Sequence, residues 1–303
     1  MGYFDLQVNG YAGVDFNSPG IEVGKLEAVC KRLEAQGVDG ILATVITDTI
    51  PEMEMRLRQI VALRNQSEIV RRVIQGIHIE GPFINPEAGY RGAHPLDAIT
   101  LTEVSAMERL LEAGSGLTRI VTLAPECDPG MKVTRLLADR GVVVSAGHTN
   151  ATLDDLKQAV DAGLGMFTHT GNGCPATMHR HDNIVQRALS LRGKIWLCFI
   201  ADGVHIPFFV LKNYLALAGL EKTVVVTDAI VAADLGPGRF QFGRWDLLIG
   251  EDLVARAPDS SHFVGSTVTM PKSYTNLIEQ AGLSASDALR LLEVNPRKAL
   301  QPR

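Results

Sequence analysis

Three side chains in this sequence could together hold a divalent metal ion: Glu80, His148 and His169. Each stands at or just after the end of a short apolar run that we expect to be a β-strand. Two imidazoles and a carboxylate that leave one position open to water make a catalytic zinc site. The alternative is that the histidines are hydrogen-bonded core residues and the glutamate a solvated strand end, which better explains either histidine alone. The set of three, together with Asp228, favours the metal.

Asp228 stands at the end of an expected strand, directly after the apolar residues 224–226 and Thr227. A charge at that depth is costly unless it is paired or needed. A carboxylate beside a metal-activated water can take a proton from it and later deliver that proton to a departing amine. The alternative is an aspartate that caps the next segment. Next to the Glu/His/His set, we interpret Asp228 as the general base.

Eight short apolar runs alternate with longer amphipathic stretches, which predicts a (β/α)8 TIM-type barrel. Such a barrel carries its chemistry at the carboxyl ends of the strands, where the polar residues above fall. The expected strands are Tyr3–Val8, Gly40–Ile46, Val73–Ile79, Arg119–Ala124, Val142–Ala146, Gly165–Thr168, Ile195–Ala201 and Thr223–Thr227.

The stretches between the strands are expected to be helices. Helices are predicted over Val23–Gln36, over Glu52–Arg72 with Pro51 at the first turn, and from a capping box at Thr152 to Asp161. The segment from about 235 to 265 breaks the alternation, and its glycines and short apolar runs predict a small β-hairpin insertion after strand eight. Two further helices, about Pro271–Ala281 and Ser284–Glu293, follow. We expect residues 1–303 to form a single domain.

Composition sets the class of protein. The 303 residues are 46% hydrophobic and 21% charged, with a formal net charge of −5. These values are typical of globular proteins, and the negative charge gives no general attraction to nucleic acid or to anionic membranes. No apolar run is long enough for a membrane span, and the first residues lack the basic flank of a signal peptide. Four widely spaced cysteines fit a reducing compartment, so we expect a cytoplasmic protein.

The loop after His169 offers two more candidate sites. Gly171-Asn-Gly-Cys-Pro-Ala176 resembles a dinucleotide fingerprint, but it follows the sixth strand and no helix directly follows it, so we reject that interpretation. His179-Arg180-His181 is a basic cluster in an acidic chain. It is either a solvated loop or an anion site, since the guanidinium fork suits phosphate oxygens.

Several strings resemble the N-acetylglucosamine-6-phosphate deacetylases, which belong to the amidohydrolase superfamily of metal-dependent barrels. The most specific are HIEGPF at 78–83, AGHTNAT at 146–152 and ADGVH at 201–205. FDLQVNG at 4–10, RGAH at 91–94, VTD at 226–228, GSTVTM at 265–270 and NPRKA at 295–299 support them in the same order. The resemblance covers nearly the whole chain.

The resemblance implies removal of acetyl from an N-acetyl amino sugar 6-phosphate, most simply N-acetylglucosamine 6-phosphate. It implies that Glu80, His148 and His169 bind the metal and that Asp228 acts as general base and then acid. His94 would help to polarise the acetamido carbonyl. The implied substrate-binding residues are Asn172, Gly173, Arg180 and His205, and the family's arginine at position 180 often reaches in from a second subunit, which implies a homodimer.

One metal ion is expected rather than two. Strand one offers Gln7 and Asn9 where many superfamily members carry two histidines, and amides are poor zinc ligands. Zn2+ is the expected ion, and the ligand set would also accept Fe2+, Co2+ or Mn2+.

This chain departs from the family pattern in three places. The loop Thr170–Cys174 has smaller residues, which implies a roomier sugar pocket, and His181 and Asp182 replace a usual Glu-Pro. Only Met1–Tyr3 precede the first motif, so we expect the barrel without the family's flanking β-sandwich. These departures leave two alternatives open. One is a deacetylase of N-acetylgalactosamine 6-phosphate or another N-acyl substrate, and the other is a non-catalytic barrel that only binds a sugar phosphate.

Overall fold

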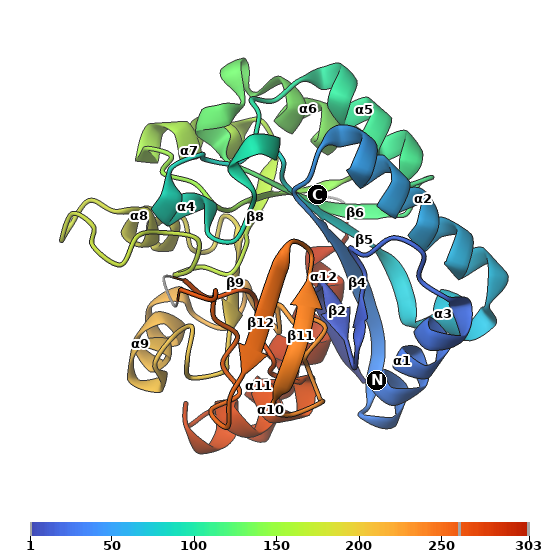
Figure 1. Ribbon diagram of the computed structural model, residues 1–303. Helices are drawn as coiled ribbons and strands as arrows, with labels where there is room; N and C mark the ends of the chain where they lie inside the picture. The colour runs from blue at the N-terminus through green and yellow to red at the C-terminus, as the bar shows by residue number, and fades with distance from the viewer. Residues whose placement is uncertain (1, 260–261, 302–303) are drawn as a thin grey trace.

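The computed structural model describes residues 2–259 and 262–301, and its centre is a parallel sheet of eight strands (Figure 1). Each strand pairs in parallel with its neighbour in the order β1-β4-β5-β6-β7-β8-β9-β10. All eight expected strands are present, with boundaries within two residues of those predicted. Their bounds are β1 (Tyr3–Val8), β4 (Val38–Ile46), β5 (Ile74–Glu80), β6 (Thr118–Leu123), β7 (Val143–Ala146), β8 (Leu164–Phe167), β9 (Trp196–Ile200) and β10 (Thr223–Val226).

The first and last strands of this order meet and nearly close the sheet into a barrel. A parallel bridge joins Val8 to Ala229, and the backbone N–H of Asn9 donates to the Ala229 carbonyl at 2.7 Å. Deeper in the barrel, the Thr227 hydroxyl donates to the Asp5 carboxylate at 2.5 Å. The predicted eight-stranded barrel is confirmed.

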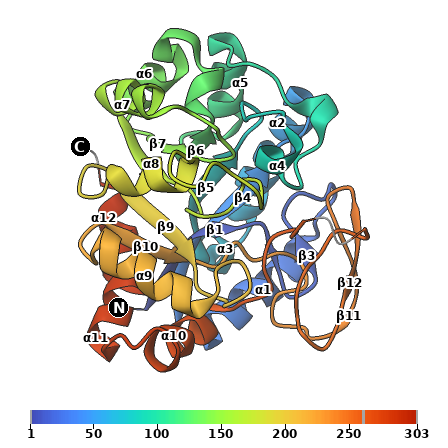
Figure 2. The ribbon, with the colours of Figure 1, turned by 90° about the vertical axis from the view of Figure 1, so that its left-hand side faces the viewer.

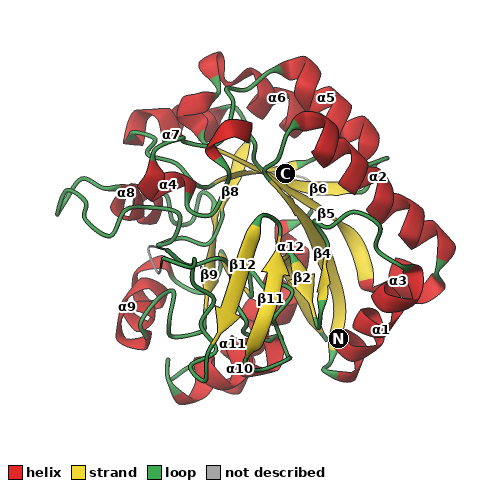
Figure 3. Ribbon diagram, viewed as in Figure 1, coloured by secondary structure: helices red, strands yellow, loops and turns green. Residues whose placement is uncertain are grey.

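Helices cover the outside of the barrel (Figure 3). No helix among residues 2–259 and 262–301 has the length and apolar character that crossing a membrane requires. The helices between strands are α1 (Val23–Ala35), α2 (Ile50–Gln66), α3 (Glu68–Val73), α4 (Ala88–Arg91), α5 (Val104–Ala113), α6 (Lys132–Asp139), α7 (Leu153–Asp161), α8 (Ile184–Ser190) and α9 (Phe208–Ala218). Those after the last strand are α10 (Met270–Glu279), α11 (Ala285–Leu289) and α12 (Asn295–Ala299), and short 3₁₀ turns occur at Leu96–Ala98, Pro125–Cys127 and Pro129–Met131.

The local signals for helix starts are confirmed, but two helices differ from the prediction. Pro51 lies in the first turn of α2, and Thr152 forms a capping box with Asp155 at the start of α7. The helix predicted over Glu52–Arg72 is instead two helices. They are separated at Ser67, whose backbone is extended and whose hydroxyl donates to Glu27 of α1 at 2.7 Å. This bond to a neighbouring helix ties Ser67 down at the break between α2 and α3.

The last predicted helix, Ser284–Glu293, is a regular α-helix only as far as Leu289. α11 begins after the capping side chain of Ser284, but from Arg290 to Val294 the backbone widens into a π turn before α12. Pro296 lies in the first turn of α12. Because proline has no N–H to give to the carbonyl four residues back, the α pattern cannot run through this position unchanged.

The core has two layers. One buried cluster draws most of its side chains from the strands, as filling a barrel requires, and includes Phe4, Leu6, Leu42, Ile120, Met166, Cys198, Ile200, Val224 and Val226. The larger cluster joins strand residues to the inner faces of the helices, for example Ile77 and Val121 with Leu57, Met107 and Leu110. The interior also buries a few polar side chains, such as Asp5, His78 and Thr122, and each of them is hydrogen-bonded.

An antiparallel hairpin follows the last barrel strand and lies at one end of the barrel, away from the chain termini (Figure 2). Its strands are β11 (Gly238–Phe242) and β12 (Trp245–Ile249), and a second small ribbon, β2 (Gly10–Tyr11) with β3 (Val14–Asp15), follows β1. At the hairpin turn, Arg244 pairs with Asp48 at 2.7 Å and with Asp97 at 2.9 Å. The Trp245 indole donates to the Ala93 carbonyl at 3.0 Å. These bonds hold the hairpin against the loops that follow β4 and β5.

Asp5 is a carboxyl buried inside the barrel. It accepts hydrogen bonds from the Thr227 hydroxyl at 2.5 Å and from the backbone N–H of Gln7 at 3.2 Å. Burial, with a smaller contribution from the charge of Asp228, raises the pKa of Asp5 from 3.8 to about 7. The folded protein therefore keeps a proton on Asp5 at pH values where the unfolded chain has released it. Such a group makes stability fall as pH rises from about 4 to about 7.

Replacing Asp5 with Asn should remove this contribution, because the amide does not ionise. Urea unfolding at several pH values should show the variant gaining on the wild type by roughly 4 kcal/mol between about pH 4 and about pH 7. The matched control is Asp161→Asn, a change at an exposed carboxyl, which should follow the wild type at every pH. Parallel pH courses for Asp5→Asn and wild type would contradict the assignment.

Candidate metal centre and active site

The sequence predicted nine site residues, and eight of them line one cavity of about 520 Å³. The cavity opens where the carboxyl ends of the barrel strands meet the hairpin, since Ile46, Asp228 and Phe242 all line it. The eight residues are Glu80, His94, His148, His169, Asn172, Gly173, His205 and Asp228. Arg180 is the exception.

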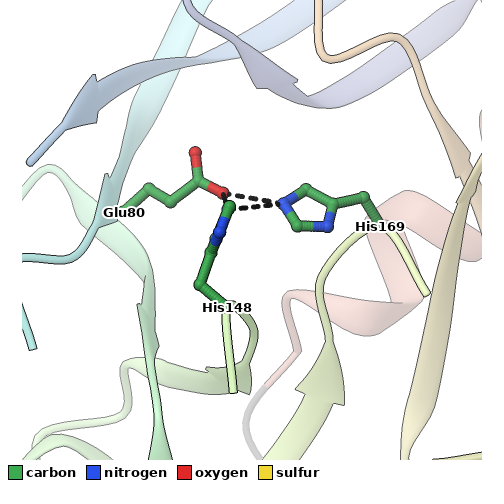
Figure 4. Close-up of side chains that lie close together, drawn as sticks. All are labelled: Glu80, His148 and His169. Carbon is green, nitrogen blue, oxygen red and sulfur yellow. Dashed lines mark hydrogen bonds and ion pairs between the residues drawn. The ribbon is translucent and has the colours of Figure 1, made fainter. Parts of the chain in front are cut away.

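Glu80, His148 and His169 point toward one another from the ends of β5, β7 and β8 (Figure 4). The nitrogen His169 Nε2 lies 3.0 Å from Glu80 Oε1 and 3.1 Å from His148 Nε2. His148 Nε2 lies 3.4 Å from the same glutamate oxygen. All three side chains are buried, and one candidate ligand atom of each lies within 4.8 Å of the others. Three donor atoms facing one point is the arrangement that a tetrahedral ion with an open position needs.

A hydrogen bond on the far side of His148 shows that this donor set fits a cation. His148 Nδ1 lies 2.8 Å from the Tyr90 carbonyl oxygen, which can only accept. The ring therefore carries its proton on Nδ1 and directs the lone pair of Nε2 into the cluster. Fixing a ligand tautomer through the second ring nitrogen is the usual arrangement at protein metal sites.

The charges in the cluster favour an ionised glutamate. Burial alone would raise the pKa of Glu80, but the adjacent imidazoles of His148 and His169 outweigh burial and hold that pKa well below its usual range. Burial acts against a charge on His169, yet the hydrogen bond and the charge of Glu80 raise its pKa. A buried carboxylate thus draws positive charge toward itself, and a divalent ion would supply it.

The backbone at three of these residues adopts a conformation that few side chains tolerate. The φ angles are +50° at His148, +31° at His169 and +53° at Asp228. Positive φ outside glycine is uncommon and costs of order 1–3 kcal/mol per residue. All three follow directly on strand ends, and the left-handed turn directs each side chain into the cavity.

Two amides from the end of β1 hold the Asp228 carboxylate. Gln7 Nε2 donates to Asp228 Oδ1 at 3.0 Å and also to the two oxygens of Glu80, at 3.1 and 3.2 Å. Asn9 Nδ2 donates to the same Asp228 Oδ1 at 2.7 Å. Within the described part of the chain Oδ2 has no hydrogen-bond partner, so it is the oxygen left to exchange a proton. Burial, reinforced by the negative charge of Glu80, raises the pKa of Asp228 to about 6.

His94 lies beside the cluster on the loop after β5. Its ring stands edge-on to that of His148, with centroids 4.3 Å apart. Nδ1 lies 2.7 Å from the hydroxyl of Thr47, the residue after β4. Burial, with the adjacent His148, lowers the pKa of His94 to about 3, so its imidazole is neutral.

The loop after β8 lines the opposite side of the cavity with small and polar groups. Asn172 donates its backbone N–H to the His169 carbonyl at 2.9 Å. Its side-chain nitrogen is buried and has no partner among the described residues, which suits a ligand contact. Gly173 has a φ of +61°, and a side chain there would press against the His148 ring at 3.0 Å.

His205 and Arg180 are placed very differently. His205 lines the cavity, with Nδ1 2.6 Å from Asp202 Oδ2 and its ring 4.9 Å from that of Phe263. Arg180 is exposed on the loop between β8 and α8 and does not line the cavity. That loop extends outward at the left of Figure 1.

Several residues that line the cavity or lie just behind its lining were not predicted from the sequence. Thr47, which bonds to His94, directly follows a predicted strand, so the rule about strand ends could have identified it. Phe242 comes from the hairpin and Tyr214 from helix α9. No local signal marks these two, because only the tertiary fold brings them to the cavity.

Comparison with known proteins places this geometry among sugar phosphate enzymes, although no family model matches the chain. The chain is 33% identical to the N-acetylglucosamine-6-phosphate deacetylase of Bos taurus, over 99% of this chain and 73% of the relative. It is 28% identical to the N-acetylgalactosamine-6-phosphate deacetylase of Escherichia coli O157:H7, over 98% and 77%. Among solved structures, the chain resembles a mutant N-acetyl-D-glucosamine-6-phosphate deacetylase from Mycobacterium smegmatis in complex with N-acetyl-D-glucosamine-6-phosphate. The two superpose with a TM-score of 0.88 at 29% identity, over 99% of this chain and 77% of the other.

Metal binding by the three-residue cluster can be measured directly. Protein freed of metal by a chelator should take up one equivalent of Zn2+ per chain, and its melting temperature should rise. The stabilisation should reach about 2.7 kcal/mol when free metal is 100 times the dissociation constant. Glu80→Gln should lose both effects, because a neutral amide is a poor ligand.

The matched control is His179→Gln, at an exposed histidine outside the cluster, which should bind metal as the wild type does. Uptake of Zn2+ by Glu80→Gln with wild-type affinity would show that the metal lies elsewhere.

Proposed function

The chain belongs to the N-acetylglucosamine-6-phosphate deacetylase family, and we propose that it hydrolyses the acetamido group of N-acetylglucosamine 6-phosphate to give glucosamine 6-phosphate and acetate. The observation that carries the proposal is the buried Glu80–His148–His169 cluster facing Asp228 across one cavity. A binding module would have no use for both a metal cluster and a carboxylate poised near neutral pKa. Release of acetate from the sugar phosphate by metal-loaded protein is the direct test.

Glu80, His148 and His169 would hold one divalent ion, Zn2+ by the chemistry of the ligands and with Fe2+, Co2+ or Mn2+ as substitutes. Bound there, the ion would supply Lewis-acid chemistry to the amide carbonyl and to the attacking water. Gln7 and Asn9 are engaged by Asp228, which supports a single ion.

Asp228 would move the proton during hydrolysis. With Oδ1 held by two amide donors, Oδ2 is the oxygen that takes the proton from the attacking water. The same oxygen would then deliver that proton to the departing sugar nitrogen, so that the carboxylate is regenerated. Burial and the negative charge of Glu80 raise the pKa of Asp228, which favours this carboxylate as a proton acceptor.

The other contacts would bind the sugar phosphate. His94 would polarise the acetamido carbonyl, and Asn172 and Gly173 would contact the sugar. His205 would meet the phosphate together with Arg180, and an arginine that lies outside its own cavity supports the view that it serves the partner in a homodimer.

A second substrate has a specific observation in its favour. The Escherichia coli O157:H7 relative acts, by its name, on N-acetylgalactosamine 6-phosphate. In this chain the loop that carries Asn172 has glycine at 171 and 173. The small loop leaves room for the other epimer, so both sugars belong in the activity assay.

Three finer expectations accompany this proposal. The barrel and the segment 235–265 would act as one hydrolase domain. The hairpin in that segment would be an addition after strand eight. The protein would work in the cytoplasm. Its substrate would be a small phosphorylated sugar.

Asp228→Asn should abolish acetate release while leaving substrate binding intact. The amide can still accept and donate hydrogen bonds but cannot take a proton, so kcat should fall by roughly 10³-fold or more. Calorimetry should show the substrate still binding within a few-fold of wild type. Asp161→Asn serves as the exposed control. A turnover rate close to that of wild type would remove Asp228 from the mechanism.

Arg180→Ala should raise KM for N-acetylglucosamine 6-phosphate by roughly tenfold to a hundredfold, since a charge-assisted bond to phosphate is worth about 1.5–3 kcal/mol. Activity on unphosphorylated N-acetylglucosamine should stay as it was. The control is Arg58→Ala, at an exposed arginine on α2. Equal losses on both sugars would exclude the phosphate role.

Mixing two inactive or weakened variants tests the partner contribution. A dimer of Arg180→Ala with Asp228→Asn has one site with an intact aspartate and an arginine donated by the other subunit. If the arginine crosses between subunits, mixing should restore a low KM; if it acts within its own chain, KM should stay high.

A further inference from the structure

We propose that Glu126 is a positioning residue for the metal ligand His148. Its carboxylate ties the turn that follows His148 to the loop whose Tyr90 carbonyl orients the imidazole. The inference rests on the proposed function for the metal ion and on the contacts of Glu126 for the positioning. Strand β6 lies between β5 and β7 and carries no member of the metal cluster, and Glu126 lies in the 3₁₀ turn Pro125–Cys127 that follows β6.

Glu126 holds the backbone that directly follows His148. The backbone N–H of Asn150 donates to Glu126 Oε1 at 2.6 Å, and the Thr149 hydroxyl donates to Glu126 Oε2. The oxygen of that hydroxyl also accepts from the backbone N–H of Ala151 at 2.9 Å, which leaves the hydroxyl proton for the carboxylate. The positive φ of +50° at His148 is thus followed by a segment that one carboxylate fixes at two points, and such a conformation persists only where its surroundings hold it.

The same carboxylate holds the loop between β5 and α4. Asn85 Nδ2 donates to Glu126 Oε1 at 2.9 Å, and Asn85 Oδ1 accepts from the backbone N–H of Glu87 at 2.9 Å. Because a backbone N–H can only donate, the second contact fixes which end of the Asn85 amide is the oxygen, and the nitrogen therefore faces the carboxylate. The backbone N–H of Asn85 also donates to the His148 carbonyl at 2.9 Å.

This loop supplies the carbonyl that orients the imidazole. The Glu87 carbonyl accepts from the backbone N–H of Tyr90 at 2.9 Å, and the Tyr90 carbonyl accepts from His148 Nδ1 at 2.8 Å. Since Asn85 holds the N–H of Glu87, a short series of hydrogen bonds joins Glu126 to the orienting carbonyl. His148 is therefore held through its own turn and through its ring, and both supports lead to Glu126.

The position of the His148 ring matters because three donor atoms must face one ion. His148 Nε2 lies 3.1 Å from His169 Nε2 and 3.4 Å from Glu80 Oε1, so a rotation of the ring would carry its lone pair away from the other two donors. A ligand that is already held in its binding geometry loses less freedom when the ion binds. Partners that orient metal ligands typically change metal affinity by about 10- to 100-fold when they are removed.

The turn after His148 has a second support, which should allow the protein to fold without the Glu126 carboxylate. Arg187 of α8 donates from Nη1 to the Ala151 carbonyl at 3.1 Å and to Asn150 Oδ1 at 3.3 Å. Glu126 is itself only partly buried, so water can reach the donors that it leaves when it is shortened to alanine. Loss of Glu126 should therefore loosen the placement of His148 rather than unfold the barrel.

The affinity for Zn2+ is the first test, measured by competition with a chromogenic chelator. Glu126→Ala should raise the dissociation constant for Zn2+ by about 10- to 100-fold. Glu126→Gln should stay within about threefold of wild type, because its amide oxygen can still accept from Asn150 and Asn85 while its nitrogen donates to the Thr149 hydroxyl. The matched control is Glu112→Ala, at an exposed glutamate of α5, which should bind Zn2+ as the wild type does.

Two results of this test would overturn the proposal. One is a wild-type dissociation constant in Glu126→Ala. With it, equal falls in the melting temperatures of the metal-free and the metal-bound protein would mark Glu126 as structural only. The other is an equal loss of affinity in Glu126→Gln and Glu126→Ala, which would show that the charge of Glu126 acts on the ion and not its hydrogen bonds.

A combined variant tests whether Asn85 and Glu126 act together. Asn85→Ala should also weaken Zn2+ binding. In Asn85→Ala combined with Glu126→Ala, the loss of affinity should be smaller than the product of the two single losses, because the residues share one hydrogen bond. Losses that multiply fully would show that the two side chains support the site independently and would contradict the series of bonds from Glu126 to Tyr90.

Hydrogen exchange on metal-free protein provides a reading that needs neither metal nor catalysis. In Glu126→Ala the backbone amides of Asn85 and Asn150 should both exchange roughly 10-fold faster, since both segments lose the group that holds them. The amide of Val144, within strand β7, should exchange as in the wild type. Unchanged protection at both Asn85 and Asn150 would contradict the proposal.

These outcomes separate this inference from the proposed function. Wild-type protein that binds Zn2+ but releases no acetate from any acetamido sugar would end the proposed deacetylase activity, while the effect of Glu126 on metal affinity would stand. Wild-type protein that releases acetate, together with an unchanged dissociation constant in Glu126→Ala, would end this inference alone.

Discussion

Two carboxylates share one cavity in this protein, and their mutual repulsion sets the requirements that the rest of the site meets. Glu80 is drawn to the ionised form by two imidazoles, while Asp228, a short distance away, is pushed toward the protonated form by burial and by Glu80. The Gln7 amide bridges the two carboxylates with one nitrogen. Opposite shifts for neighbouring acids are a way to give each a separate role. Here one carboxylate suits a cation and the other suits a proton.

The barrel supplies this separation by bending its chain sharply at the strand ends. Histidine and aspartate side chains that continued along the strands would lie against the outer helices or in the packed interior. The left-handed backbone at His148, His169 and Asp228 directs them into the space between the strands instead. Strain of this kind persists only where the surrounding structure holds it, and here the eight-stranded sheet and its bridging amides do so.

Much of this arrangement could be predicted from residue patterns, and the failures have physical causes. The strands were predictable because each is a short apolar run between turn residues, and the cluster because its members follow those runs. The break at Ser67 was not, since it depends on Glu27 of another helix. Tyr214, Phe242 and the bond between Thr47 and His94 depend on how distant loops pack, which periodicity does not encode. Arg180 is conspicuous in the sequence, but it is exposed and does not line the cavity of its own chain.

The seam between β1 and β10 has a consequence for biosynthesis. β1 is the first strand to leave the ribosome, yet its second neighbour begins only at Thr223. All three members of the Glu/His/His trio emerge while the ring is still open. Asp228, which faces them, lies on the segment that closes the ring. Two hydrogen bonds make this closure, one from the Thr227 hydroxyl to Asp5 and one from the Asn9 backbone N–H to the Ala229 carbonyl. The Glu/His/His trio therefore comes to face Asp228 only when the ring closes, so the cavity is the last part of the barrel to be completed during synthesis.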